Sequence, residues 1–169
     1  MKTGITVHFR VRNEETYCEA ALKSVLPLAE RVLVFDTAST DSTLQKIKAI
    51  AKGDSCIEIH EVPATDAEGL CAYRNQMADM TKTEWYMIVD GDEIYPMECI
   101  EKIIEKMKAV PSNIDRIRVC RRHFYKSLNF ISEFDGLGRI FRTATVRRTL
   151  HSTAKNCHGS GKTSHVGSG

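Results

Sequence analysis

Three acidic side chains crowd one short segment in the middle of the chain: Asp90, Asp92 and Glu93. They come directly after an apolar stretch at residues 85–89, and Gly91 separates the first two. Carboxylates this close repel one another unless a cation offsets their charge. Mn²⁺ and Mg²⁺ prefer carboxylate and water ligands and commonly bridge to substrate phosphates, and a glycine lets the backbone approach a ligand closely. The segment therefore predicts a divalent-metal site, with an acidic helix-capping turn as the alternative interpretation.

Two more polar segments each follow a β-rich stretch of the sequence. Residues 10–15 read Arg-Val-Arg-Asn-Glu-Glu, and residues 36–41 read Asp-Thr-Ala-Ser-Thr-Asp. In an α/β sheet, ligands bind beyond the carboxyl ends of the strands. We therefore expect both segments to meet residues 90–93 at one edge of a sheet and to form a ligand site there. Asp36 and Asp41 also suit helix capping, which remains the alternative for both.

The elements that must position these residues follow from the apolar pattern of the first 108 residues. β-rich runs alternate with helical periodicity, and the run at 84–89 has almost no polar alternation, which is typical of a parallel sheet covered on both faces. The predicted fold class is therefore α/β, a central and mainly parallel sheet flanked by helices. The expected strands are 5–11, 31–35, 56–62 and 84–89, and the expected helices are 13–25, 44–50, 69–80 and 96–108.

Beyond residue 108 the pattern changes. Residues 116–122 alternate apolar and basic side chains, which indicates a strand with one wet face. Residues 128–134 and 139–141 are further strand candidates. We therefore expect a short mixed or antiparallel C-terminal extension of the sheet.

Composition limits the class of protein. With 169 residues, of which 42% are hydrophobic and 27% charged, the chain fits one soluble globular domain. No apolar run reaches the roughly 20 residues that a membrane-spanning helix needs, and the N-terminus lacks the apolar core of a signal peptide. The six cysteines are scattered without a Cys-x-x-Cys pair, which predicts reduced thiols in a cytoplasmic protein and argues against a zinc site.

Charge is unevenly distributed, although the net charge is only +2. From Pro111 onward there are eleven Lys and Arg residues against three Asp and Glu residues, whereas the preceding part is acidic. A basic surface raises the local concentration of anions. The second part of the chain is therefore either a solvated basic face or a surface that meets phosphates or an anionic acceptor.

Four short motifs follow one another along the chain. They are Arg-Asn-Glu-Glu at 12–15, Asp-Thr-Ala-Ser-Thr-Asp at 36–41, Ala-Tyr-Arg-Asn at 72–75 and Asp-Gly-Asp at 90–92. This order and spacing resembles the family 2 glycosyltransferases with the GT-A fold, over roughly residues 4–108. The chain departs from the family pattern at Arg10, where a proline or small residue is usual, and at Ala38, where a glycine is usual.

The resemblance implies a metal-dependent, inverting glycosyltransferase that moves a sugar from a nucleotide-sugar donor, in particular a UDP-sugar, to an unknown acceptor. It implies Mn²⁺ or Mg²⁺ as the cofactor, with Asp92 as a metal ligand and Asp90 on the ribose or the metal-bound water. Asp36 would accept a hydrogen bond from the uracil ring or a ribose hydroxyl, and Arg74 would lie near the base or the diphosphate. The implied donor-binding residues are Arg10, Asn13, Glu15, Asp36, Arg74, Asp90 and Gly91.

The resemblance also predicts the domain organisation. One GT-A-like domain would occupy residues 1–158, with a nucleotide-binding half at 1–110 and an acceptor-side half at 111–158. The Gly/Ser-rich tail at 159–169 is expected to be flexible. Members of the family are generally longer, so this chain has little room for an acceptor domain.

The acceptor-side half holds the candidates for the catalytic base. An inverting transfer needs a base that takes the acceptor proton, and Glu133 and Asp135 are the only carboxylates after Asp115. Asp135 is slightly favoured because a glycine follows it, and a solvated loop acid is the alternative interpretation for both. His165 faintly resembles a C-terminal His-x-Gly element of some relatives and is a candidate third metal ligand, with a flexible tail as the alternative.

Three other functions compete with this prediction. A nucleotidyltransferase shares the α/β core and acidic metal ligands, but it usually carries a glycine-rich loop after the first strand, and residues 10–15 contain no glycine. A dinucleotide-binding oxidoreductase is disfavoured because the Gly-x-Gly-x-x-Gly motif is absent. A truncated or non-catalytic module that binds a sugar nucleotide stays open because the chain is short.

Overall fold

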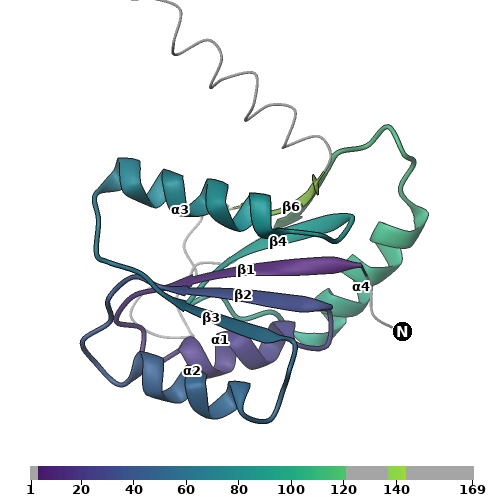
Figure 1. Cartoon of the computed structure of the whole chain (residues 1–169). Helices are drawn as coiled ribbons and strands as arrows, with labels where there is room; N and C mark the ends of the chain where they lie inside the picture. Colours follow the sequence, from purple (N-terminus) through teal and green to yellow (C-terminus); the bar gives the residue numbers. More distant parts are fainter. Residues whose placement is uncertain (1–3, 121–136, 144–169) are drawn as a thin grey trace, which may run out of the picture.

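The computed structural model describes residues 4–120 and 137–143, which form one sheet of six strands with helices on both faces (Figure 1). The strands are β1 (Ile5–Val11), β2 (Arg31–Asp36), β3 (Ile57–Glu61), β4 (Trp85–Asp90), β5 (Arg116–Cys120) and β6 (Leu137–Arg142). The helices are α1 (Cys18–Val25), α2 (Thr43–Ala51), α3 (Ala67–Met80) and α4 (Met97–Ala109).

The strand order across the sheet is β3-β2-β1-β4-β6-β5. Strands β1 to β4 are parallel, while β6 runs antiparallel to β4 and β5 runs antiparallel to β6. The expected α/β fold with a mainly parallel sheet and a short antiparallel extension is therefore confirmed. The strand expected at 139–141 is confirmed within β6, whereas the candidate at 128–134 lies outside the described residues.

The main hydrophobic core lies on the face of the sheet that α1, α2 and α4 cover. Alternate residues of β1, beginning with Ile5 and Val7, point to this face and are fully buried. Ile47 of α2 and Ile100 of α4 pack in the same cluster. Burying one such side chain contributes roughly 1.5–3 kcal/mol. This core fixes the four parallel strands side by side and so aligns their carboxyl ends.

Helix α3 covers the opposite face, where it packs on β2 (Figure 1). Met77 of α3 joins Leu33 and Phe35 in a smaller buried cluster. Because β2 has a helix on each face, its side chains from Val32 to Asp36 are all buried. Double coverage therefore explains why parallel strands of this sheet lack polar alternation.

Two further findings concern the described residues as a group. None of their helices combines the length and the apolar character that a membrane crossing requires. Their cysteines with described side chains are free thiols: Cys18, Cys56, Cys71 and Cys99.

Candidate functional site

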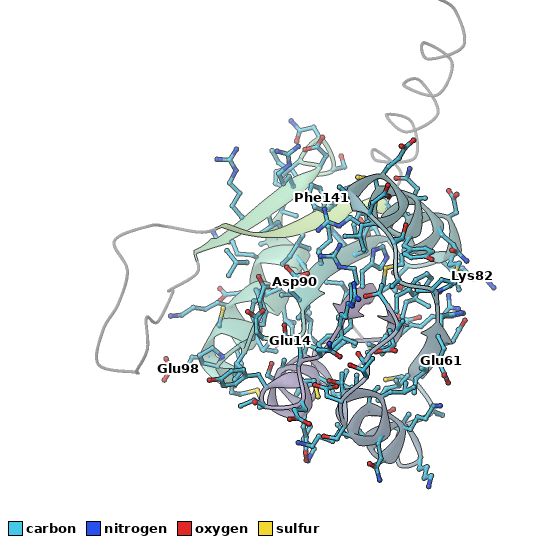
Figure 2. All side chains as sticks on the ribbon, turned by 90° about the vertical axis from the view of Figure 1, so that its left-hand side faces the viewer. Glu14, Glu61, Lys82, Asp90, Glu98 and Phe141 are labelled. Atoms are coloured by element: carbon cyan, nitrogen blue, oxygen red, sulfur yellow. The ribbon has the colours of Figure 1, made fainter. Side chains whose placement is uncertain are left out.

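The segments that follow β1, β2 and β4 meet at the carboxyl edge of the sheet, as the sequence predicted. A cleft of about 330 Å³ opens there. Figure 2 looks onto this edge, with Asp90 and Glu14 labelled near its centre. The residues that line the cleft are Arg10, Val11, Arg12, Glu14, Thr37, Thr65, Leu70, Asp90, Gly91 and Asp92.

Asp90 and Arg10 face one another at the base of the cleft. They occupy matched register positions at the ends of β4 and β1, and Arg10 Nη2 lies 3.5 Å from Asp90 Oδ1. Asp90 Oδ1 is buried and has no hydrogen-bond partner among the described residues, although the side chain as a whole is 41% exposed. The burial of Oδ1 is consistent with the exposure of the whole side chain, because Arg10 covers this one oxygen and the rest of the carboxyl group opens to the cleft. An unsatisfied buried acceptor costs roughly 1–3 kcal/mol, which a ligand donor or cation would offset.

Glu14 and Asp92 add negative charge to the same cleft. Asp92 is exposed, and Glu14 is half-buried beside it. Burial, and after it the negative charge of Asp92 and of two further aspartates, raises the pKa of Glu14 above its ordinary value. The cleft therefore carries an excess of negative charge, which a divalent cation would offset.

Gly91 permits the close approach of two loops. A Cβ atom built on Gly91 would lie 2.8 Å from Val11 Cγ2 and 2.9 Å from Glu14 Cγ. Such distances are too short for carbon atoms in contact, so only glycine fits without a shift. We expected a ligand to lie close to Gly91. In the structure, Val11 at the end of β1 and Glu14 after it lie close to Gly91.

Asp36 is almost fully enclosed at the end of β2, with 2% of its surface exposed. Its Oδ2 accepts a hydrogen bond from the Ser39 amide at 3.1 Å, whereas Oδ1 is buried without a hydrogen-bond partner in the described part of the chain. Thr37, the next residue, lines the cleft. Buried polar atoms are nearly always paired, so the orphaned oxygen of Asp36 indicates a missing donor.

Asn13 and Glu15 tie the segment after β1 to the segment after β2. Asn13 Oδ1 accepts from the Thr40 amide at 2.8 Å, and Glu15 Oε2 accepts from the Ser42 hydroxyl at 2.8 Å. Asn13 has a positive φ of 54°, which asparagine tolerates better than most residues. Both residues lie outside the set that lines the cleft, so within the described structure they hold the loops together.

The other predicted site residues lie elsewhere. Arg74 is exposed on α3 and does not line the cleft. Asp41 accepts a hydrogen bond from the first-turn amide of Thr43 at 2.9 Å, as expected of a helix-capping residue. Glu133, Asp135 and His165 lie outside the described residues.

Residues 4–120 and 137–143 contain no group of three or more His, Cys, Asp and Glu side chains arranged to hold a metal ion. Mg²⁺, however, is usually bound through one or two carboxylates together with waters and substrate phosphates. Asp92, with the accessible part of Asp90, fits this requirement, since both line the cleft. The residues present are therefore suited to a metal that arrives with a phosphate-bearing ligand.

Several residues of the cleft were not among the predicted site residues. Glu15 was predicted instead of its neighbour Glu14, and Arg12 was named only as part of a motif. Thr65 comes from the connection between β3 and α3, and Leu70 comes from the first turn of α3. Because β3 is parallel to β2, its carboxyl end reaches the same edge, and this topology is the signal that could have indicated them.

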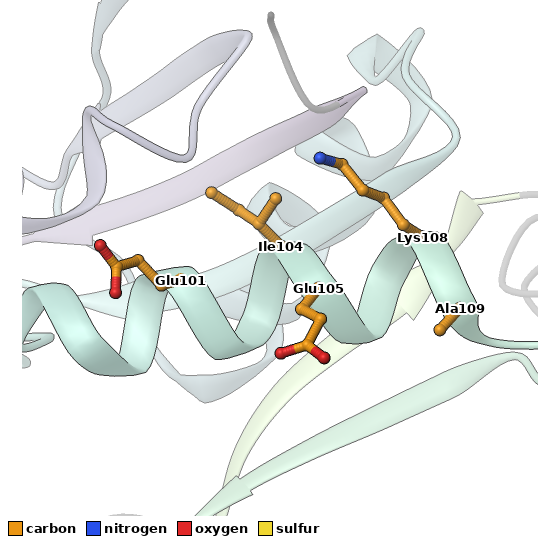
Figure 3. Close-up of a pocket in the computed structure, with 5 residues that line it drawn as sticks. All are labelled: Glu101, Ile104, Glu105, Lys108 and Ala109. Atoms are coloured by element: carbon orange, nitrogen blue, oxygen red, sulfur yellow. The ribbon is translucent and has the colours of Figure 1, made fainter.

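A second hollow, of about 480 Å³, lies along α4 and is larger than the cleft. Figure 3 shows that its side chains all project from this one helix. It receives none of the segments that follow the strands, so its greater size does not make it the functional site. Its lining residues are Glu101, Ile104, Glu105, Lys108 and Ala109.

Comparison with known proteins identifies the class to which this fold and cleft belong. The sequence model described as Glycosyl transferase family 2 matches residues 6–163, and the chain therefore belongs to this family. The expected family membership is thus confirmed. No curated protein sequence matches the chain significantly.

Solved structures agree on the fold. Residues 1–349 of TarS from S. aureus superpose with a TM-score of 0.60 and 20% identity, over 89% of this chain and 49% of that fragment. The mannosyltransferase PcManGT from Pyrobaculum calidifontis, solved with GDP-Man and Mn²⁺, gives a TM-score of 0.62 and 19% identity, over 86% of this chain and 46% of PcManGT. At such identities the likeness shows the fold, which is the expected GT-A type. The chain spans about half the length of these two solved chains.

Proposed function

We propose that this protein is a glycosyltransferase whose cleft binds a nucleotide-sugar donor together with Mn²⁺ or Mg²⁺. The observation that carries the proposal is the placement of Asp90 and Asp92 in a cleft at the carboxyl edge of a family 2 fold. The buried oxygen of Asp36 that lacks a hydrogen-bond partner in the described part of the chain supports it, since this atom needs a donor. Solved relatives with the same fold contain GDP-Man with Mn²⁺ in one case and UDP in another.

The charged residues at the cleft and beside it have the following roles in this proposal. Asp36 accepts a hydrogen bond from a ring N–H of the base, which suits the uracil of a UDP-sugar. Asp92 and Asp90 would hold the cation, which would supply positive charge that stabilises the departing diphosphate. Arg12 faces the cleft as a second source of positive charge, and Arg10 fixes the carboxyl group of Asp90.

The transfer itself is proposed to invert the configuration at the sugar carbon. The acceptor hydroxyl attacks this carbon from the side opposite the diphosphate, and a carboxylate takes its proton. Asp135 and Glu133 remain the candidates for that base, and His165 remains a candidate third ligand of the metal. These three assignments rest on the sequence alone.

A second candidate function is a module that binds a sugar nucleotide without turnover. Within the described residues, the cleft holds groups suited to the donor, whereas both candidates for the base, Asp135 and Glu133, lie outside those residues. Binding and turnover are separable by experiment, because a module would bind the donor with its metal and release no nucleoside diphosphate.

The test is nucleoside diphosphate release by the full chain from a panel of UDP- and GDP-sugars, with Mn²⁺ or with a chelator. We expect release only with the metal, and we expect Asp92→Asn to lower it by about 100-fold or more because one charged ligand is lost. Glu105→Gln removes an exposed carboxylate on α4, far from the cleft, and should leave the rate unchanged.

Two results would count against parts of this proposal. Full metal-dependent release by Asp92→Asn would show that the metal assignment is wrong. Metal-dependent donor binding without any release would favour the binding module.

A further inference from the structure

The α3 face of the sheet divides into two parts. Helix α3 packs on β2, whereas β5, at the other end of the sheet, presents exposed basic side chains on this face. Arg116 and Arg118 of β5 are both exposed. Ile117, between them, points the other way and packs against the main core. This alternation places the two arginines on the same face as Asp90.

A row of stacked rings leads from β1 across the sheet to Arg116. The ring centroids of His8 and Tyr86 lie 4.5 Å apart, and those of Tyr86 and Phe141 lie 5.3 Å apart. The guanidinium carbon of Arg116 lies 5.4 Å from the Phe141 centroid, in the range of a cation–π contact. Arg116 is therefore held at a defined position on the sheet surface, over Phe141, whose place on the sheet Figure 2 labels.

The charges of these two arginines are uncompensated within the described structure. Arg31 pairs with Glu58, and Arg142 pairs with Glu84. Arg116 and Arg118 have no ion-pair partner within residues 4–120 and 137–143. Two residues apart on a strand, they stand about 7 Å from one another, which lets two guanidinium groups grip one phosphate.

The strand register places this pair beside the cleft. Arg118 lies opposite Arg139 of β6, and Arg139 lies opposite Ile88 of β4, two residues before Asp90. Two strand spacings and two residues of rise separate the Cα atoms of Arg118 and Asp90 by about 12 Å. A distance of this size leaves room for one small hydroxyl-bearing group between a phosphate bound by the arginines and a sugar bound in the cleft.

We propose that the acceptor is an alcohol that also carries a phosphate group, and that Arg116 and Arg118 bind this phosphate; the inference rests on the proposed function. In the transfer, the acceptor hydroxyl oxygen bonds to the sugar carbon as the bond from this carbon to the diphosphate breaks. The electron pair of the broken bond leaves with the nucleoside diphosphate, and the hydroxyl proton passes to the base. The acceptor phosphate takes no part in bond breaking and serves to orient the hydroxyl.

The test is a ¹⁵N NMR titration of the full chain saturated with UDP and Mg²⁺, followed through the side-chain Nε–Hε signals of Arg116 and Arg118. Glycerol 3-phosphate is the monoester probe, glycerophosphoglycerol is the diester probe, and glycerol is the uncharged control. We expect saturable shifts of both signals with at least one phosphate probe and none with glycerol. The probe that shifts the two arginine signals shows whether the acceptor is a phosphomonoester or a phosphodiester.

Variants check that the shifts report this site. Arg116→Gln combined with Arg118→Gln should weaken binding of the responsive probe by about tenfold or more, because the charge-assisted hydrogen bonds are lost. Arg118→Lys, which keeps the charge and loses the bidentate fork, should show a smaller loss. Lys102→Gln with Lys106→Gln removes two exposed charges from α4 and should change binding less than twofold.

Failure of this inference is distinct from failure of the proposed function. Amide shifts around Asp92 on addition of UDP and Mg²⁺ report the donor site independently of the acceptor. If those shifts occur while neither phosphate probe moves the Arg116 and Arg118 signals, the acceptor inference is overturned and the donor site stands. If UDP and Mg²⁺ move nothing, the proposed function itself fails.

Discussion

At the scale of single residues, the cleft owes its shape to pairs of side chains held by the strand register. Arg10 and Asp90 meet because β1 and β4 are parallel neighbours that end together. Gly91 then lets the two connecting segments touch, with Val11 and Glu14 as its neighbours. The residues that would hold the ligand are thus positioned mainly by backbone geometry.

Gly91→Ala tests this packing. The added Cβ would lie 2.8 Å from Val11 Cγ2, so a loop must move, and overpacking of this kind costs about 1–3 kcal/mol. Gly53→Ala is the matched control, because its Cβ would meet only the Ile50 carbonyl oxygen at 3.6 Å. The free energy of unfolding in urea should fall for Gly91→Ala and stay level or rise slightly for Gly53→Ala. Equal stability of the two variants would contradict the close-approach account.

The sequence predicted part of this residue-level arrangement. The crowded acids at Asp90 and Asp92, and the position of Asp36 after a strand, were enough to place all three at one edge of a sheet. The choice between Glu14 and Glu15 could not be predicted, because it depends on the path of a loop in which Asn13 adopts a positive φ. That choice depends on hydrogen bonds to a segment 26 or more residues away, such as the Asn13 amide to Ser39.

At the scale of elements, the apolar runs predicted the strands because burial on both faces leaves a local signature. β2 and β4 are clear examples, since each is an unbroken apolar run that ends in aspartate. The insertion of β6 between β4 and β5 has no such signature. Strand order depends on pairing between distant segments, and local periodicity does not record it.

His8 joins three elements and gives the fold a pH dependence. Its ring stacks on Tyr86 of β4, and its Nε2 lies 2.6 Å from Thr81 Oγ1 after α3. Because the Thr81 hydroxyl donates to the Met77 carbonyl, His8 Nε2 is the donor to Thr81. Burial lowers the pKa of His8 to about 3 from 6.5, so the folded protein keeps this ring neutral.

Stability should therefore fall on acidification. Below pH 6.5 the unfolded chain binds a proton at His8 that the folded chain does not bind, so the free energy of unfolding decreases as the pH falls from 6.5 toward 3. Between pH 6.5 and 5 this group accounts for about 2 kcal/mol. His8→Gln keeps a donor for Thr81 and should lose that part of the decrease, measured by urea unfolding at both pH values.

The matched control for this prediction is His60→Gln, which replaces a half-buried histidine on β3. It should retain the wild-type decrease between the two pH values. A decrease in His8→Gln as large as in the wild type would show that His8 is not the group responsible.

At the scale of the whole molecule, one sheet carries two surfaces with different chemistry. The carboxyl edge of the parallel strands is acidic around Asp90 and suits a metal with a phosphate-bearing donor. The β5 end of the same sheet is basic at Arg116 and Arg118, and the sequence already indicated this through the eleven Lys and Arg residues after Pro111. The uneven charge of the chain thus corresponds to the proposed donor side and the proposed acceptor side.

The central claim is that the cleft binds a nucleoside diphosphate through a divalent cation held by Asp92. Calorimetric titration of UDP into the full chain, with Mn²⁺ or with a chelator, tests it most directly. We predict binding that weakens by about tenfold or more when the metal is removed or when Asp92→Asn replaces the wild type, while Glu105→Gln binds as the wild type does. Equal UDP affinity with and without Mn²⁺, unchanged by Asp92→Asn, would contradict the account.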